Sequence, residues 1–103
     1  MGCGRVGSSL ATELEEQGHT VSIIDQSREA FRRLGPDFKG RTISGIGFDR
    51  DTLLEAGIET ADAFAAVSNG DNSNILAARV ARETYGVGNV VARIYDPGRA
   101  EIY

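Results

Sequence analysis

The chain has 103 residues, a size that suits one domain built around a single hydrophobic core. Its net charge of −4, with 15 acidic residues, argues against a general nucleic-acid-binding protein. No stretch approaches the roughly 20 apolar residues that a membrane-spanning helix needs, and no secretory signal stands before the first glycines. The single cysteine, Cys3, excludes an internal disulfide and suits a reducing cytosol.

The chain starts with a glycine-rich loop in which Gly2, Gly4 and Gly7 form a G-x-G-x-x-G pattern. In a nucleotide-binding loop the first glycine permits a tight turn, and the second lets the backbone approach a pyrophosphate. The third lets the following helix pack close to the sheet. Asp25 ends the next apolar run, where a carboxylate accepts hydrogen bonds from ribose hydroxyls. These features together predict a mononucleotide or dinucleotide site, with a glycine-rich turn that binds nothing as the alternative.

Helices and strands alternate along the rest of the chain. Leu10 and Leu14 recur with helical spacing, and short apolar runs bounded by turn residues are typical of strands. The predicted helices cover residues 6–17, 27–34 (after Ser27 as N-cap), a brief segment capped by Asp49 or Asp51 and ended by Gly57, and about 74–85. The predicted strands cover 21–25, 42–44, 63–68 and 90–94. Pro97 suits the first turn of one more helix.

This alternation of apolar strands and helices is typical of a parallel sheet covered on both faces. We therefore predict an α/β fold with a Rossmann-type, doubly wound parallel sheet, in one nucleotide-binding domain over residues 1–103. In this fold the glycine loop follows a hydrophobic strand. We accordingly expect an opening strand before Met1 and a final helix and strand after Tyr103, so that the chain is a fragment of a longer one.

Several residues near the loop are candidate nucleotide contacts. Arg5 stands at a helix N-terminus, where a positive charge is unfavourable unless an anion lies nearby, although an exposed surface arginine is the alternative. Val6 belongs to the first turn, whose free N–H groups face the phosphate. Cys3 would face the nucleotide, where its role is to be small. Asp25 would favour NAD over NADP without separating NAD from ATP or ADP, and Gln26 beside it would line the adenosine.

Two further clusters follow predicted strands at the carboxyl ends, which is where ligands bind in open α/β sheets. Gly45 and Ile46 come directly after the second strand, and their place beside the adenine would admit a flat base. Ser68, Asn69 and the polar residues up to Asn74 follow the third strand. They offer donors to the second half of a dinucleotide or to terminal phosphates, and helix capping is the alternative for this cluster.

Signs of a catalytic site are missing from the sequence. His19, the only histidine, falls in a helix-to-strand turn away from the carboxyl ends of the strands. Lys39 is the only lysine, so neither a G-x-x-x-x-G-K-[ST] phosphate loop nor a Tyr-x-x-x-Lys pair is present. No Cys or His cluster has the spacing of a metal site. A nucleotide site without an acid–base pair indicates sensing, and we predict that the chain is not an enzyme.

Four stretches of the chain resemble the TrkA N-terminal domain family, also called the RCK or KTN domain, of bacterial Trk and Ktr potassium-uptake systems. The stretches are GCGRVGSSLATELEEQGHTVSIID, GFDRDTLLEAGIETADAFAAVS, SNGDNSNILAARVARE and VVARIYDPGRAEIY. The resemblance implies a cytosolic regulatory subunit, peripheral to the inner face of the plasma membrane. Its dimers would build a ring against a potassium-translocating membrane subunit, and binding of NAD(H), ATP or ADP would gate that subunit.

The resemblance also implies roles for particular residues. It places the pyrophosphate on the three loop glycines and the ribose on Asp25, with Arg5 approaching the terminal phosphate of ATP and Arg93 lying near the site. Many family members carry an acid directly after the glycine that matches Gly45, where this chain has Ile46. Two other functions stay open: the cofactor-binding half of an NAD-dependent dehydrogenase, and the cytosolic RCK domain of a single-chain potassium channel.

Overall fold

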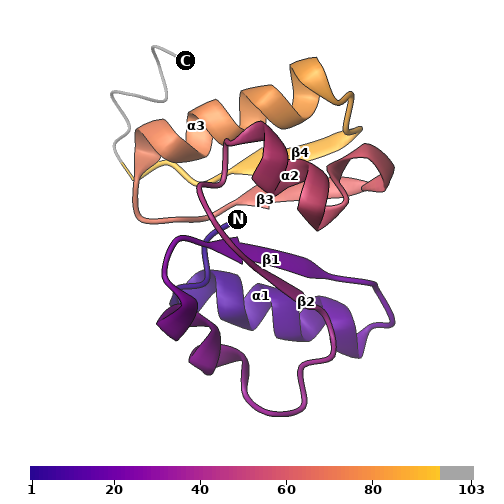
Figure 1. The fold of residues 1–103 in the computed structure, drawn as a ribbon, viewed down its shortest axis with the longest axis vertical. Coiled ribbons are helices and arrows are strands. Elements are labelled where there is room, and N and C mark those ends of the chain that lie inside the picture. Colours follow the sequence, from indigo (N-terminus) through magenta and orange to yellow (C-terminus); the bar gives the residue numbers. More distant parts are fainter. Residues whose placement is uncertain (96–103) are drawn as a thin grey trace.

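The computed structural model describes residues 1–95, so the helix predicted at Pro97 lies outside the described residues. The helices are α1 (Arg5–Glu16), α2 (Arg50–Ala56) and α3 (Asp71–Arg79), with the 3-10 helices η1 (Arg28–Leu34) and η2 (Ile58–Thr60) and the π-helical turn η3 (Val80–Thr84). The strands are β1 (Ser22–Asp25), β2 (Arg41–Ser44), β3 (Ala63–Ala66) and β4 (Asn89–Ala92). Helices and strands alternate in the predicted order (Figure 1).

The strands form two parallel pairs. Strand β1 pairs with β2 from Ser22 opposite Arg41, and β3 pairs with β4 from Ala63 opposite Asn89. A helical segment connects the two strands of each pair, as a parallel pair requires. The α/β class and the parallel strands predicted from the sequence are therefore confirmed.

Met1 and Gly2 lie between the two pairs, and the N-terminus sits between β1 and β3 in Figure 1. The Met1 amino group donates to the Ala65 carbonyl (2.8 Å), and the Met1 carbonyl accepts from the Val67 N–H (2.9 Å). On the other side the Gly2 N–H donates to the Ile24 carbonyl (2.7 Å). Across the sheet the order is therefore β2, β1, residues 1–2, β3, β4. The chain winds outward from residues 1–2 in both directions, which is the doubly wound arrangement.

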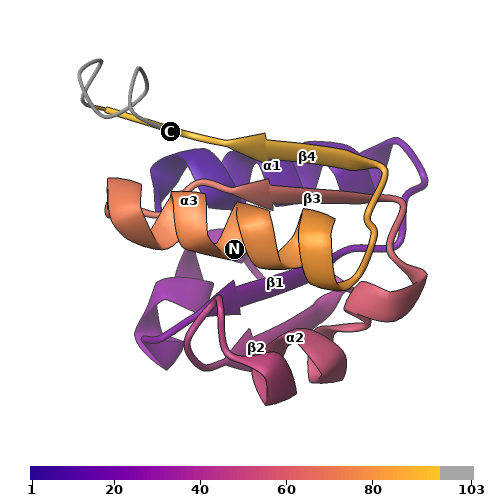
Figure 2. The ribbon, with the colours of Figure 1, turned by 90° about the horizontal axis from the view of Figure 1, so that it is seen from above.

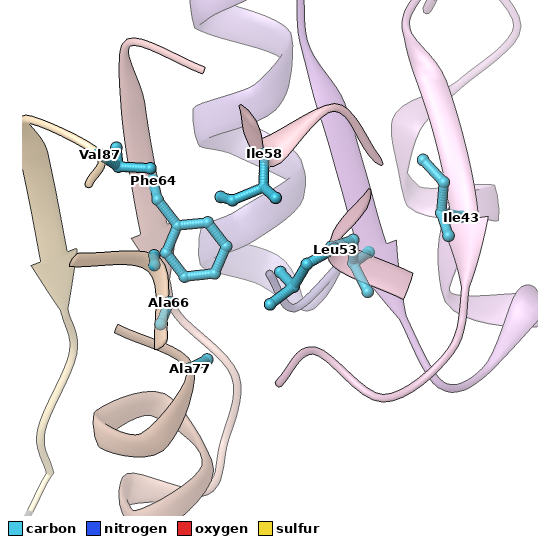
Figure 3. Close-up of a cluster of buried hydrophobic side chains, with 9 residues drawn as sticks. Ile43, Leu53, Ile58, Phe64, Ala66, Ala77 and Val87 are labelled. Carbon is cyan, nitrogen blue, oxygen red and sulfur yellow. The ribbon is translucent and has the colours of Figure 1, made fainter. Parts of the chain in front are cut away.

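Alternating side chains of β1 supply two hydrophobic cores, one on each face of the sheet. On one face Ile24 packs in a cluster with Leu53, Phe64 and Ala77, in which the Phe64 ring points toward Ile58 (Figure 3). This cluster joins β1 and β2 to β3 through α2 and α3, so it holds the two strand pairs together.

The smaller core lies on the opposite face. Ile23 packs there with Cys3, Ala11 and Leu34, which brings α1 and η1 together over β1. Helices α1 and α3 thus lie on different sides of the strands (Figure 2). Burial of Ile23 and Leu34 contributes about 1.5–3 kcal/mol each. Because Cys3 of the glycine loop belongs to the same core, this packing helps to hold the loop that precedes α1.

Helix starts differ from the predictions in two places. Ser27 precedes the 3-10 helix η1, and its side chain makes no cap hydrogen bond; instead its N–H donates to the Asp25 carboxylate (2.8 Å). Helix α3 begins at Asp71, earlier than the predicted residue 74. The predicted cap of α2 is confirmed, because Asp49 Oδ2 accepts from the Thr52 N–H (3.1 Å).

A cavity of about 760 Å³ opens between β1 and β3, in line with Met1. Leu10 and Leu14 of α1 line it on one side and Ile58 of η2 on the other.

Candidate functional site

The loop from Met1 to Gly4 connects the centre of the sheet to α1, and the fold itself requires two of the three glycines of the G-x-G-x-x-G pattern, Gly2 and Gly7. Gly2 has φ +100°, and a Cβ there would lie 2.7 Å from the Ser68 nitrogen. A Cβ on Gly7 would collide with the Gly2 carbonyl oxygen. Gly4 is different, because it has a negative φ and an added Cβ would meet nothing within 4 Å. The space beside Gly4 is therefore open.

The N-terminus of α1 carries neither of the features that normally stabilise a helix start. Its N-cap, Gly4, has no side chain to accept a hydrogen bond, and the first turn contains no acid but begins with Arg5. By contrast, α2 has the Asp49 cap and Asp51 in its first turn, and α3 has Asp71 there. The orphan N–H groups and the positive dipole end of α1 favour an anion at this position.

Asp25 lies at the end of β1, across from the loop, and is half-buried. Its Oδ2 accepts from the Cys3 N–H (2.8 Å) and its Oδ1 from the Ser27 N–H (2.8 Å). A carboxylate has about four acceptor positions, so two remain after these bonds. Asp25 therefore holds the loop in place and still has capacity for hydroxyl donors.

Burial changes the pKa of two groups near Asp25. It lowers the pKa of the Met1 amino group to about 6, although the Asp25 charge partly opposes this. It raises the pKa of the Cys3 thiol, and Asp25 adds to that effect. Cys3 is fully buried and its Sγ donates to the Ala30 carbonyl (3.3 Å), so the thiol packs inside the protein and takes no part in the pocket.

A pocket of about 240 Å³ lies at the carboxyl ends of β1, β2 and β3, which is the usual ligand position in this fold. Asp25 and Gln26 form one wall, and the polar segment after β3 forms another. The lining residues are Met1, Gly2, Ile24, Asp25, Gln26, Gly45, Gly47, Phe48, Ser68, Asn69, Gly70 and Ser73. The carboxyl ends of three strands and the glycine loop therefore meet at one site.

Most of the predicted contact residues after the strands come together in this pocket. Gln26, Gly45, Ser68 and Asn69 line it with Gly2 and Asp25. Arg5 and Val6 are exposed on the first turn of α1, outside the pocket and close to the open space at Gly4.

Three predicted residues lie elsewhere. Ile46 is 44% exposed and does not line the pocket, whereas Phe48, which was not predicted, does. Asn74 is fully buried, and its amide is used in hydrogen bonds to Ser68 and Arg93. The Arg93 guanidinium stacks over the Tyr95 ring, 4.1 Å from its centroid, beyond the end of β4. Phe48 comes four residues after the end of β2, so its place near a strand end is the signal that could have identified it.

With this geometry established, comparison with known proteins assigns the family. The model of the TrkA-N domain matches residues 1–103. The chain belongs to the TrkA-N domain family. The resemblance inferred from the four sequence stretches is thereby confirmed.

Several curated proteins are similar to this TrkA-N domain. The "Trk system potassium uptake protein TrkA" of Streptomyces coelicolor is 72% identical over 103 residues, which are 100% of this chain and 46% of that protein. The "Trk system potassium uptake protein TrkA homolog" of Pyrococcus abyssi is 40% identical, again over 100% of this chain and 45% of the relative. The chain thus spans about half the length of these relatives.

A solved structure is also similar to this TrkA-N domain. It is described as "Shewanella denitrificans Kef CTD in AMP bound form", with a TM-score of 0.84 and 25% sequence identity. The match covers 99% of this chain and 61% of that one. The likeness confirms the Rossmann-type fold of the TrkA-N domain.

Two further properties of residues 1–95 bear on function. No helix in this range has the length and apolar character to cross a membrane. No group of three or more His, Cys, Asp or Glu side chains in the same range is placed to hold a metal ion.

Proposed function

We propose that the chain is the nucleotide-binding domain of a regulatory subunit that controls potassium uptake through a membrane partner. The TrkA-N family match and the potassium-uptake names of the relatives support this proposal. The subunit would be cytoplasmic, at the inner face of the plasma membrane. Its dimers would build a ring against the potassium-translocating subunit, and NAD(H) or ATP/ADP would bias the shape of that ring.

The observation that carries nucleotide binding is the open space beside Gly4 at the uncapped start of α1. Gly2 and Gly7 have steric reasons within the fold, but no atom of residues 1–95 occupies the place where a Gly4 side chain would lie. A phosphate there would accept from the orphan N–H groups of the first turn and compensate the charge of Arg5. A ligand would thus account for the glycine at position 4, which no contact within the described residues requires.

The phosphate position also determines where the ribose and the base of a nucleotide would lie. Asp25 faces the loop with two remaining acceptor positions, which suit a pair of adjacent ribose hydroxyls. Beyond it, Gly45, Gly47 and Phe48 line the part of the pocket that would take the base. The AMP-bound state of the similar Kef domain supports an adenine nucleotide here.

The size of the pocket bears on how much of the ligand it would enclose. At about 240 Å³ it is smaller than the roughly 300–1,000 Å³ typical of whole small-molecule sites. We infer that the pocket takes the nucleoside, while the phosphates lie outside it along Gly4 and Arg5. NAD(H), ATP, ADP and AMP share the enclosed part and would differ in what they present to Arg5 and Asn69.

The site supports binding more than turnover. Among the residues that line the pocket, Asp25 is the titratable side chain, and two N–H groups already hold it. His19 lies beside the other cavity, between β1 and β3, and away from the pocket. A hydride-transfer enzyme would need an acid–base group at the nucleotide, so a sensor fits these residues better than a dehydrogenase half.

Calorimetric titration of the full-length protein with AMP, ADP, ATP, NAD and NADH tests the proposal. Gly4→Ala should weaken every ligand that binds wild type by about tenfold or more (about 1.4 kcal/mol), because the methyl group occupies the phosphate position. The fold should be unaffected, since an Ala side chain meets nothing at this φ.

Gly88→Ala is the matched control, because a Cβ there also meets nothing within 4 Å and the residue lies in the turn before β4. It should bind nucleotides like wild type. Equal affinities of Gly4→Ala and wild type would contradict the proposed phosphate position. Consumption of a bound nucleotide would favour an enzyme instead.

A further inference from the structure

One buried amide, that of Asn74 in α3, makes four hydrogen bonds in the described part of the chain. Its Oδ1 accepts from the Ser68 N–H (2.9 Å) and from the Ser68 hydroxyl (2.6 Å). Its Nδ2 donates to the carbonyl oxygens of Ser68 and Arg93, both at 2.8 Å. Asn74 is fully buried. Because a buried amide that loses its partners is costly, this orientation of Asn74 is tightly held.

The two sets of partners belong to different parts of the protein. Ser68 lines the pocket at the end of β3, whereas Arg93 directly follows β4 at the edge of the sheet. Helix α3 packs against both strands (Figure 2). The Asn74 side chain is therefore a direct link between the pocket wall and the segment after β4.

A second contact from the same helix fixes the next part of that segment. Asp71 Oδ1 accepts from the Tyr95 N–H (2.7 Å), and Asp71 is buried. The Arg93 guanidinium stacks over the Tyr95 ring. The segment that follows β4 is thus held against the first turn of α3 by a backbone contact at each end.

We propose that Asn74 is a positioning residue that couples occupancy of the pocket to the conformation of residues 93–95. The inference rests on nucleotide binding at the pocket. A ligand that contacts the pocket at Ser68 favours the conformation in which Ser68 keeps its hydrogen bonds to the Asn74 amide. Asn74 then keeps its bond to the Arg93 carbonyl, so both regions share one closed state.

Amide hydrogen exchange of the full-length protein measures this coupling. The Arg93 N–H donates to the Ala66 carbonyl (2.8 Å) and the Tyr95 N–H to Asp71, so both exchange only when the segment opens. A ligand that binds only the closed state lowers the population of the open state, and therefore the exchange rate, by a factor of 1 + [L]/Kd. AMP, ATP or NADH, whichever binds most tightly, should therefore slow both amides about tenfold at ten times its Kd.

Asn74→Asp separates coupling from binding. The substituted side chain has the same size and an oxygen that still accepts from Ser68, but it has no NH₂ to donate to the Arg93 carbonyl. Nucleotide should still bind and slow exchange at Ser68, while the slowing at Arg93 and Tyr95 is lost. Asn72→Asp, an exposed change of the same charge in the same helix turn, should keep the wild-type response.

The outcomes distinguish this inference from the proposed function. Nucleotide that binds wild type without slowing exchange at Arg93 and Tyr95 would overturn the coupling alone, even where Asn74→Asp does not fold. Slowing that persists in a folded Asn74→Asp would overturn the role of Asn74. Failure of every nucleotide to bind wild type would overturn the proposed function, and the coupling with it.

Discussion

Asp25 offers a prediction in which loop support and ribose binding can be measured separately. Asp25→Ala removes the acceptors of two N–H groups, those of Cys3 and Ser27. Ser27 is exposed and its N–H can turn to water, whereas Cys3 is fully buried. The cost to stability of the unliganded protein should therefore be that of one unsatisfied buried donor, about 1–3 kcal/mol.

Binding should suffer in addition. Hydrogen bonds to a charged acceptor contribute about 1.5–3 kcal/mol, and the half-buried position of Asp25 favours the lower end. Asp25→Ala should accordingly weaken AMP, ATP and NADH by about tenfold or more, since all three contain the adenosine ribose. Urea unfolding of the unliganded protein and calorimetric titration measure the two effects independently.

Asp25→Asn decides between the two roles of this residue. The amide oxygen can still accept from the Cys3 N–H, so most of the stability should be retained, but a pair of ribose hydroxyls loses its charged acceptor. Asp37→Ala, at an exposed acid after η1, is the control and should change neither quantity. Wild-type affinity in a stable Asp25→Asn protein would refute the ribose assignment and leave Asp25 with loop support alone.

Three other predictions follow from the same structure. Arg5→Ala should weaken the binding of ATP by up to about tenfold, that of ADP less and that of NADH only modestly, because the exposed guanidinium would lie at the terminal phosphates. An equal loss of affinity for all three in calorimetric titrations would instead assign Arg5 to loop support. Gly7→Ala should lower the free energy of unfolding by about 1–3 kcal/mol in urea titrations, because its Cβ overlaps the Gly2 carbonyl, and an unchanged midpoint would contradict that packing. In the 103-residue chain with a free Met1 amino group, burial lowers the pKa of that group from 8.0 to about 6. The unfolded chain then binds more protons between about pH 6 and pH 8, so the free energy of unfolding should rise over this range, by at most about 1.4 kcal/mol per pH unit. Urea midpoints at both pH values, with an N-acetylated chain as the flat control, check this rise, and a fall would contradict it.

Local patterns in the sequence were sufficient for the order and type of most elements. The spacing of Leu10 and Leu14 identified α1, and the cap at Asp49 identified the start of α2. The third predicted strand, 63–68, was too long, since β3 ends at Ala66, and the Val67 N–H that follows it bonds to the Met1 carbonyl. That bond joins residues that are 66 positions apart in the sequence, so no local sequence pattern could predict it.

The site shows the same division. Glycine spacing and the acid at Asp25 indicated the loop and its partner, and strand ends indicated Gly45 and Ser68. The orientation of Asn74 could not be predicted, because its partners come from β3 and β4 and depend on how α3 packs between them. Phe48 similarly resembles an ordinary core residue until β2 is placed beside β1.

Potassium flux is the measurement that tests the central claim most directly. Proteoliposomes would hold the potassium-translocating subunit with the full-length protein, and NAD, NADH, ADP, ATP or AMP would be added in turn. We predict that flux depends on which nucleotide is present, that Gly4→Ala removes this dependence, and that no nucleotide is consumed; a tenfold preference for one state corresponds to about 1.4 kcal/mol of bias. Flux that is the same with all five, despite measured binding of at least one, would contradict the account.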